Sequence, residues 1–182
     1  INPVPVEVPD YGAESYIEEF GWEDKFVFGM HQRDNIHIFS PVPLEAYEEI
    51  QSDDTAFLIL GGSTNHRKQA KDYQLKNVKF LDTTSDISLI HKFLNTLNVY
   101  AHGRSDGEQC SSAIIEGLSH SLPMISHTAV SMGQLEQIGD AGVVVDGYEE
   151  YAQSMKNMMN NKNYYVECKV NAEKRYLSLI HI

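Results

Sequence analysis

Short apolar runs alternate with longer amphipathic stretches along most of this 182-residue chain. The apolar runs predict buried strands at residues 26–29, 56–60, 78–81, 99–102, 124–126 and 143–145. The stretches between and after them predict helices at residues 43–51, 66–73, 85–95 (capped by Ser85), 111–119, 132–138, 148–159 and 164–176. Strands that alternate with helices form βαβ units with parallel strands. We therefore expect one α/β domain with a doubly wound, Rossmann-like parallel sheet.

The two ends of the chain differ from this pattern. Three prolines within the first nine residues are typical of an extended linker, so residues 1–22 are interpreted as an interdomain linker and lead-in. Residues 23–176 form the predicted domain. Residues 177–182 match what a common sequencing adapter would encode, and we interpret them as read-through in an environmental sequence; a genuine helix end is the alternative.

The composition of the chain disfavours several classes of protein. The chain has 26 acidic and 14 basic residues and a formal net charge of -12, which disfavours binding to nucleic acid or to a membrane surface. No apolar run approaches the roughly 20 residues that span a bilayer, so we expect no transmembrane segment. Two cysteines, Cys110 and Cys168, are too few for a disulfide framework. These features favour a reduced, cytoplasmic protein.

The loop after the strand at 99–102 carries the most chemistry. Ligands of open parallel sheets lie beyond the carboxyl ends of the strands. Here Gly103 and Gly107 permit a tight turn and a close approach of the backbone to a ligand. Ser111 and Ser112 then begin a helix, whose free amide groups suit a phosphate.

Two carboxylates, Glu108 and Glu116, lie on either side of this helix start. Eight residues of helix would separate them by about 12 Å, too far for the carboxylate pair of a glycosidase, which needs roughly 5–9.5 Å. The spacing suits one extended ligand held at both ends: a sugar near Glu108, a ribose near Glu116 and a diphosphate between them.

Glu108 and Glu116 resemble the E-x7-E signature of retaining GT-B glycosyltransferases, a large family that includes many bacterial polysaccharide enzymes. The surroundings agree with this resemblance. Residues 99–102 are similar to the apolar strand before the signature, 116–125 to the "EA(M/L)..G.PVI" passage, 141–144 to the "G.LV" strand, and 1–4 to the "PNPV" interdomain linker. The resemblance implies the C-terminal, donor-binding half of a GT-B fold.

In this family the second glutamate binds the ribose hydroxyls and the first contacts the donor sugar, which implies these roles for Glu116 and Glu108, the latter as the catalytic position. The amides of Gln109, Cys110 and Ser111 are then expected to face the sugar and phosphates. The resemblance implies a nucleoside-diphosphate sugar as donor substrate, with no metal or cofactor. It also implies a separate N-terminal acceptor domain, so we expect this chain alone to bind a donor without catalysing transfer.

The chain departs from the family pattern around the phosphates. Cys110-Ser111 stands where Phe-Gly is usual, Met30 follows Gly29 where arginine is usual, and the expected downstream lysine is missing. Arg33 and Arg104 are therefore the expected phosphate ligands. Asp106 and Gly107 complete the predicted substrate-binding loop.

Other interpretations stay open. A GT-B enzyme that epimerises UDP-sugars would share these motifs, and a non-enzymatic Rossmann-like module could bind a nucleotide or a partner. The histidines show no metal-ligand spacing. We expect His102 and His127 to end strands facing the ligand cleft.

Overall fold

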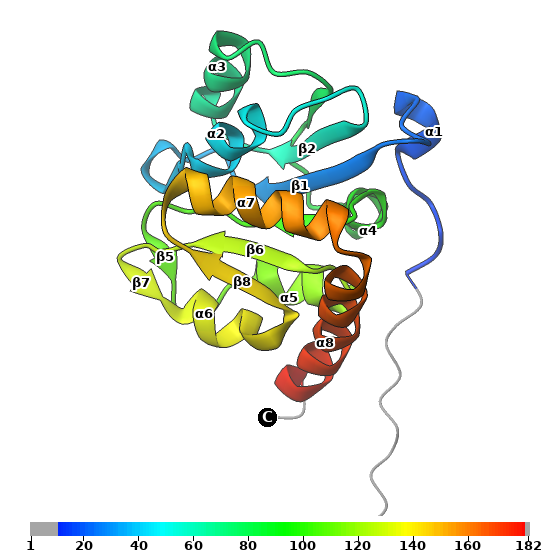
Figure 1. Ribbon diagram of the computed structural model, residues 1–182, viewed down its shortest axis with the longest axis vertical. Coiled ribbons are helices and arrows are strands. Elements are labelled where there is room, and N and C mark those ends of the chain that lie inside the picture. Colours follow the sequence, from blue (N-terminus) through cyan, green and yellow to red (C-terminus); the bar gives the residue numbers. More distant parts are fainter. Residues whose placement is uncertain (1–10, 181–182) are drawn as a thin grey trace, which may run out of the picture.

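A computed structural model describes residues 11–180 of the chain (Figure 1). Six strands of this part form one sheet: β1 (Phe26–Gln32), β2 (Thr55–Gly61), β3 (Val78–Leu81), β4 (Val99–Ala101), β6 (Met124–His127) and β8 (Gly142–Val145). A separate two-stranded ladder pairs β5 (Gly107–Glu108) with β7 (Ser131–Met132).

Helices connect the strands and cover the sheet. The α-helices of the described part are α1 (Ile17–Phe20), α2 (Val42–Glu48), α3 (Thr64–Asp72), α4 (Ile87–Thr96), α5 (Ser112–Ser119), α6 (Gly133–Ile138), α7 (Gly147–Asn160) and α8 (Lys162–Ile180). Short 3-10 helices are η1 (Ile36–Ile38) and η2 (Gly139–Ala141). Helix α7 crosses in front of the strands in Figure 1 and packs with α2, while α5 packs with α6 and α8.

The strand order is β3-β2-β1-β4-β6-β8, and every neighbouring pair is parallel. From β1 the chain moves outward to β2 and β3, and then returns to β4 on the other side of β1. This reversal makes the gap between the carboxyl ends of β1 and β4 a topological switch point, where such sheets bind ligands. The predicted fold class, a doubly wound Rossmann-like sheet, is confirmed.

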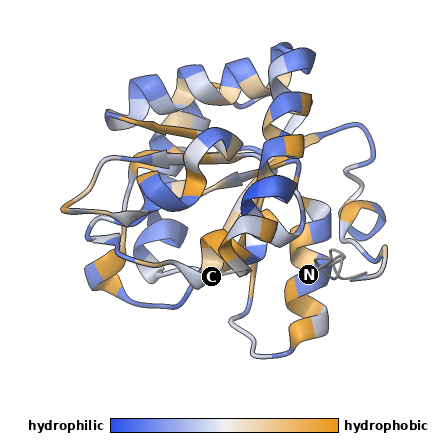
Figure 2. Ribbon diagram, turned by 90° about the horizontal axis from the view of Figure 1, so that it is seen from below, coloured by the Kyte–Doolittle hydropathy of each residue, from blue (hydrophilic) through white to orange (hydrophobic). Residues whose placement is uncertain are grey.

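Close packing of β1 against its neighbours depends on Gly29. A Cβ atom at this position would lie 2.4 Å from the carbonyl oxygen of Leu58 and 2.6 Å from Cδ2 of Leu97, so no larger residue fits. All seven residues of β2 are buried. Figure 2 shows the hydrophobic residues along the strands and the hydrophilic residues on the outer sides of the helices. The core therefore lies on both faces of the sheet, as a doubly wound fold requires.

Several boundaries differ from the prediction. Strand β1 continues to Gln32 because its last three residues pair with the buried strand β2. Asp86, and not Ser85, caps α4: its side chain accepts a hydrogen bond from the Ser88 amide at 2.9 Å. Helix α1, η1 and the β5–β7 ladder were not predicted.

The structure describes only part of the predicted linker and tail. Tyr16 and Trp22, within the predicted lead-in, are buried in the core of the domain. Helix α8 includes residues 177–180, so most of the proposed adapter segment is helical, and its origin stays a prediction. The "PNPV"-like residues 1–4 and the last two residues lie outside the described part.

Candidate functional site

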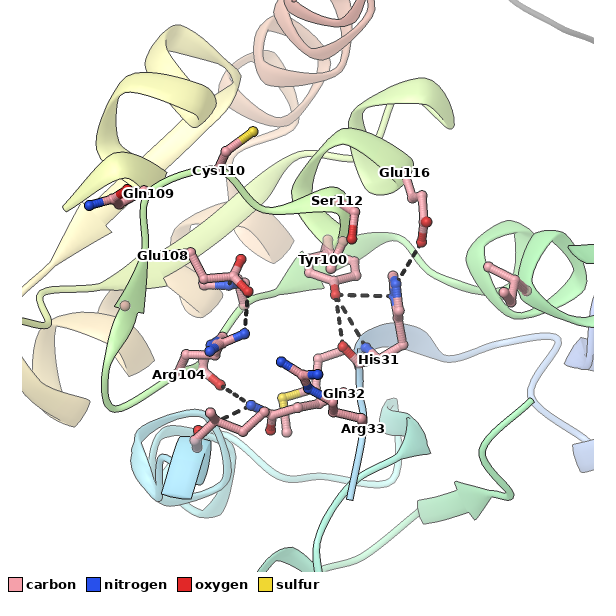
Figure 3. A pocket seen from close by; sticks show the side chains of 17 residues that line it. His31, Gln32, Arg33, Tyr100, Arg104, Glu108, Gln109, Cys110, Ser112 and Glu116 are labelled. Carbon is pink, nitrogen blue, oxygen red and sulfur yellow. Dashed lines mark hydrogen bonds and ion pairs between the residues drawn. The ribbon is translucent and has the colours of Figure 1, made fainter. Parts of the chain in front are cut away.

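A cavity of about 840 Å³ lies at the switch point between β1, β4 and the start of α5. Its lining includes most of the predicted site residues: Arg33, Arg104, Gly107, Glu108, Gln109, Cys110 and Glu116. Asp106 and Ser111 lie beside the cavity and are not part of its lining. The cavity also includes His31, Gln32, Tyr100 and His102, and Figure 3 shows how several of these side chains lie.

Glu108 lies in β5 at one end of the cavity, with its side chain 15% exposed. Its Oε1 forms an ion pair with Arg104. Its Oε2 is buried with no hydrogen-bond partner, 3.7 Å from Nε2 of His102, which is also buried without a partner. Burial raises the pKa of Glu108, but the polar groups of His102 and Ser111 and the charge of Arg104 outweigh burial and lower it below its usual value. The carboxylate is therefore ionised at neutral pH.

Arg104 is neutralised by two carboxylates. Its Nε and one terminal nitrogen donate to the two carboxylate oxygens of Asp106 at 2.9 and 2.8 Å, and its other terminal nitrogen donates to Glu108. The hydrogen bond from Arg104 lowers the pKa of Asp106. Asp106 therefore holds Arg104 against Glu108, and the charge of Arg104 is largely offset before any ligand binds.

Arg33 follows the end of β1, lines the cavity and is exposed. No hydrogen bond or ion pair joins its guanidinium to another described residue. Its charge nonetheless contributes to lowering the pKa of Asp106, so the two side chains lie near one another. Of the two arginines in the lining, Arg33 has the more available charge.

Glu116 lies in α5 at the opposite end of the cavity from Glu108, with its side chain 42% exposed. Its Oε2 is 2.7 Å from Nε2 of His31 at the end of β1. The hydroxyl of Tyr100, in β4, is 3.1 Å from Nδ1 of the same histidine (Figure 3). Burial raises the pKa of Tyr100, so its hydroxyl stays protonated and can donate this hydrogen bond. His31 was missed by the sequence analysis.

The start of α5 closes the cavity between the two glutamates. Ser112 and Ala113, its first two residues, line the cavity, and their amides have no acceptor among the described residues. Ser111 has a structural contact instead: its Oγ accepts from the Ile114 amide at 3.3 Å. Its own amide donates to Oε1 of Gln137 at 2.7 Å. The expected ligand contact from the Ser111 amide stays a prediction, and in this structure Ser112 and Ala113 hold the free amides.

The two histidines expected at the cleft differ in position. His102 lines the cavity, and its Nδ1 lies 2.8 Å from the Ser126 hydroxyl. His127 is buried beside it and bonds to the hydroxyl of Ser40 at 2.7 Å, outside the lining. Burial lowers the pKa of His127. Across residues 11–180, no three His, Cys, Asp or Glu side chains are arranged to hold a metal ion, and no helix is long and apolar enough to cross a membrane.

Three solved structures illustrate what the fold is similar to. HepE from Anabaena, crystallised with UDP, has a TM-score of 0.76 at 17% identity, over 89% of this chain and 46% of HepE. A glycosyltransferase from Rickettsia africae gives 0.74 at 16% identity, over 89% and 45%. The pneumococcal O-GlcNAc transferase GtfA, crystallised with UDP and GlcNAc, gives 0.71 at 13% identity, over 98% and 37%. The chain thus spans less than half the length of these proteins.

No curated protein sequence matches the chain. The family model described as "Glycosyl transferases group 1" matches residues 15–175, nearly all of the part that the structure describes. The fold of the chain matches that of the C-terminal domains of GT-B glycosyltransferases. The chain belongs to the glycosyl transferases group 1 family.

Proposed function

We propose that this domain binds a nucleoside-diphosphate sugar, and that the protein to which it belongs transfers the glycosyl group to an acceptor with retention of configuration. The observation that carries the proposal is the arrangement of the cavity. Glu108 and Glu116 lie at its two ends, and the free amides of Ser112 and Ala113 lie between them. The two carboxylates can accept hydrogen bonds from hydroxyl groups, and the helix start between them can bind an anion. This order matches a sugar at Glu108, a diphosphate at the helix start and a ribose at Glu116.

The sugar end is supported by unsatisfied polar atoms. Oε2 of Glu108 and Nε2 of His102 are buried, lie 3.7 Å apart and have no hydrogen-bond partner. Leaving such atoms unpaired costs roughly 1–3 kcal/mol each. A sugar hydroxyl can donate to the carboxylate and bond to the imidazole at once, which would remove both penalties.

Binding of the diphosphate, between the two ends of the cavity, relies on the helix start and Arg33. The amides of α5 and the positive end of its dipole attract an anion. Arg33 adds a charge that no described carboxylate pairs with, whereas Arg104 is held by Asp106 and Glu108. Similarity to HepE and GtfA, which were crystallised with UDP, makes UDP the first nucleotide to test.

Thermal unfolding with a panel of ligands tests donor binding. UDP, GDP and ADP and their sugars are compared with uridine and inorganic pyrophosphate. A true ligand at 100 times its Kd should raise Tm by roughly 5–10 °C, because it binds only the folded state. If no nucleoside diphosphate raises Tm, or if pyrophosphate raises it as much, the proposed donor site is wrong.

Retention is tested on the longer protein that contains this domain. With a donor identified by the panel, NMR of the first-formed product reports the anomeric configuration of the new bond. The same configuration as in the donor supports the proposal. Inversion contradicts the mechanism, and release of an epimerised sugar favours the epimerase alternative.

A further inference from the structure

We propose that His31 is the positioning residue of the nucleotide site: it holds the carboxylate of Glu116 in the orientation that accepts the ribose hydroxyls. The inference rests on the proposed function, and it assigns a role to a residue that no motif of the sequence indicated. His31 touches Glu116 and not the ribose in this role, so it acts on the ligand only through the carboxylate.

The geometry points to a pre-set carboxylate. Glu116 extends from a helix with its side chain 42% exposed, and such a side chain loses rotamer entropy when a ligand fixes it. Nε2 of His31 lies 2.7 Å from Oε2 of Glu116 and restricts this freedom beforehand. The Oε1 atom has no partner among the described residues, and each carboxylate oxygen can accept two hydrogen bonds. Both oxygens therefore stay able to accept from a ribose.

His31 is itself held rigidly. Its ring lies edge-on to those of Phe93 and Tyr100, with centroids 5.8 and 5.5 Å away. Both of these aromatic residues are fully buried. The Tyr100 hydroxyl lies 3.1 Å from Nδ1 and accepts from the His31 amide at 3.2 Å. A histidine anchored to the two central strands is a fixed point from which a helix side chain can be oriented.

The hydrogen bonds around His31 show which atom donates to Glu116. The His31 amide donates to the Tyr100 oxygen, and the Tyr100 hydroxyl proton faces both Nδ1 of the ring at 3.1 Å and the His31 carbonyl oxygen at 3.3 Å. Because a carboxylate oxygen only accepts, Nε2 of His31 carries the proton and donates to Glu116. Tyr100 thereby holds the ring on its Nδ1 side, which leaves Nε2–H directed at the carboxylate. The Tyr100 hydroxyl consequently supports the site through His31.

The experiment compares two ligands that differ only in the ribose hydroxyls. UDP and 2′,3′-dideoxy-UDP are titrated calorimetrically into the wild-type chain and into His31→Ala, Glu116→Ala and the double variant. We expect His31→Ala to weaken UDP binding about tenfold, or about 1.4 kcal/mol, and to leave dideoxy-UDP binding nearly unchanged. In the Glu116→Ala background, His31→Ala should have no further effect, because the carboxylate it positions is absent.

Conservative variants separate positioning from folding. His31→Gln can still donate to Glu116 and should recover part of the affinity for UDP. Tyr100→Phe keeps the buried ring and should give a smaller, equally ribose-dependent loss. His37→Ala is the matched control, since this exposed histidine lies outside the cavity. Circular dichroism and ligand-free Tm show which variants are folded.

The outcomes distinguish this inference from the proposed function. If the wild-type chain does not bind UDP, GDP or ADP, the proposed function fails and the inference with it. If UDP binds and Glu116→Ala weakens it, but His31→Ala and Tyr100→Phe do not, only the role of His31 is overturned. Equal losses for UDP and dideoxy-UDP would likewise show that His31 stabilises the fold and does not serve the ribose.

Discussion

Among individual residues, Glu116 has the most direct test. Its carboxylate is accessible from the cavity, in contrast to Glu108, which Arg104 holds. Glu116→Ala should weaken binding of a nucleoside diphosphate by roughly 1.5–3 kcal/mol, the range for hydrogen bonds to a charged group. Glu116→Gln should cost less, because the amide oxygen still accepts one hydroxyl. Titration calorimetry measures both, and an unchanged Kd in Glu116→Ala would rule out the ribose assignment.

Arg33 should contribute more to binding of the diphosphate than Arg104, which is already paired with Asp106 and Glu108. Because Arg33 has no carboxylate partner among the described residues, Arg33→Ala should weaken UDP binding by about 1.5–3 kcal/mol, the size of a hydrogen bond to a charged group. Uridine binding should be nearly unaffected. Affinities measured at low and high salt should show a weaker salt dependence in this variant. Equal losses for UDP and uridine would indicate that Arg33 supports the fold and not the phosphate.

The sequence predicts the loop residues of the site better than the strand residues. Glu108 and Glu116 follow from a local spacing, and the structure brings both to one cavity with Arg33 and Arg104. His31 has no such local signal. It reaches the cavity because β1 pairs with β2 as far as Gln32, a contact between segments about 30 residues apart. Only the register of that pairing shows which residues end the strand at the ligand side.

At the scale of elements, the cap of α5 connects the site to stability. The Ser111 hydroxyl accepts from the Ile114 amide at 3.3 Å. Ser111→Ala should therefore lower the free energy of unfolding by about 1 kcal/mol, as the loss of an N-cap generally does. Ser112→Ala, one residue further along, removes no cap and serves as the stability control. Urea denaturation measures both, and equal stabilities of the two variants would contradict the capping role.

Helix α3 should make the domain sensitive to acid. Nδ1 of the buried His66 accepts from the Ser63 amide at 3.0 Å, which completes a capping box. Burial, helped by the charge of Arg67, lowers the pKa of His66 to about 4. A folded pKa below the unfolded value of about 6.5 means that stability is present above that pH and is lost as the pH falls toward 4, by up to roughly 3 kcal/mol.

His66→Gln tests this pH dependence. Glutamine at the same position of a capping box can accept from the Ser63 amide and does not titrate. Urea denaturation at pH 7 and pH 4.5 should show a smaller loss of stability in this variant than in the wild type. The loss should not vanish, because burial also lowers the pKa of His120 to about 4. The exposed His37→Gln should behave as the wild type, and an undiminished loss in His66→Gln would refute the prediction.

Elements with their own hydrophobic period are predictable from sequence, whereas those that depend on contacts are not. The six strands of the sheet and the main helices match the alternating pattern. The β5–β7 ladder has only two residues on each side. It requires Gly107 at a φ of +67°, where a Cβ atom would lie 1.9 Å from the Ser131 carbonyl oxygen. Nothing in the periodicity of residues 103–117 indicates this partner 24 residues away.

For the whole molecule, alternation predicts a parallel sheet but not the order of its strands. The right-handed crossover rule allows both a continuous progression and a reversal. The observed order reverses between β1 and β4, and this reversal is what opens the cavity beside Tyr100 and His31. The long loop after β4 indicates the position of the cavity because its carboxylates and glycines lie at the carboxyl edge of the sheet, whatever the order.

This chain alone should not catalyse glycosyl transfer. Transfer requires an acceptor hydroxyl held about 3–3.5 Å from the anomeric carbon of the donor. The described residues supply a cavity at the carboxyl edge of the six-stranded sheet, and the chain spans only 46% of HepE. Water that reaches the donor from the acceptor side would also weaken the electrostatic interactions between the donor and the residues of the cavity. We therefore expect the purified chain to bind a donor and to hydrolyse it at most slowly.

Incubation with the donor and panels of sugar, lipid and peptide acceptors, followed by measurement of released nucleoside diphosphate, provides the test. Rapid release that depends on an acceptor would show that this domain alone completes the active site, and would contradict its assignment as the donor half of a GT-B enzyme.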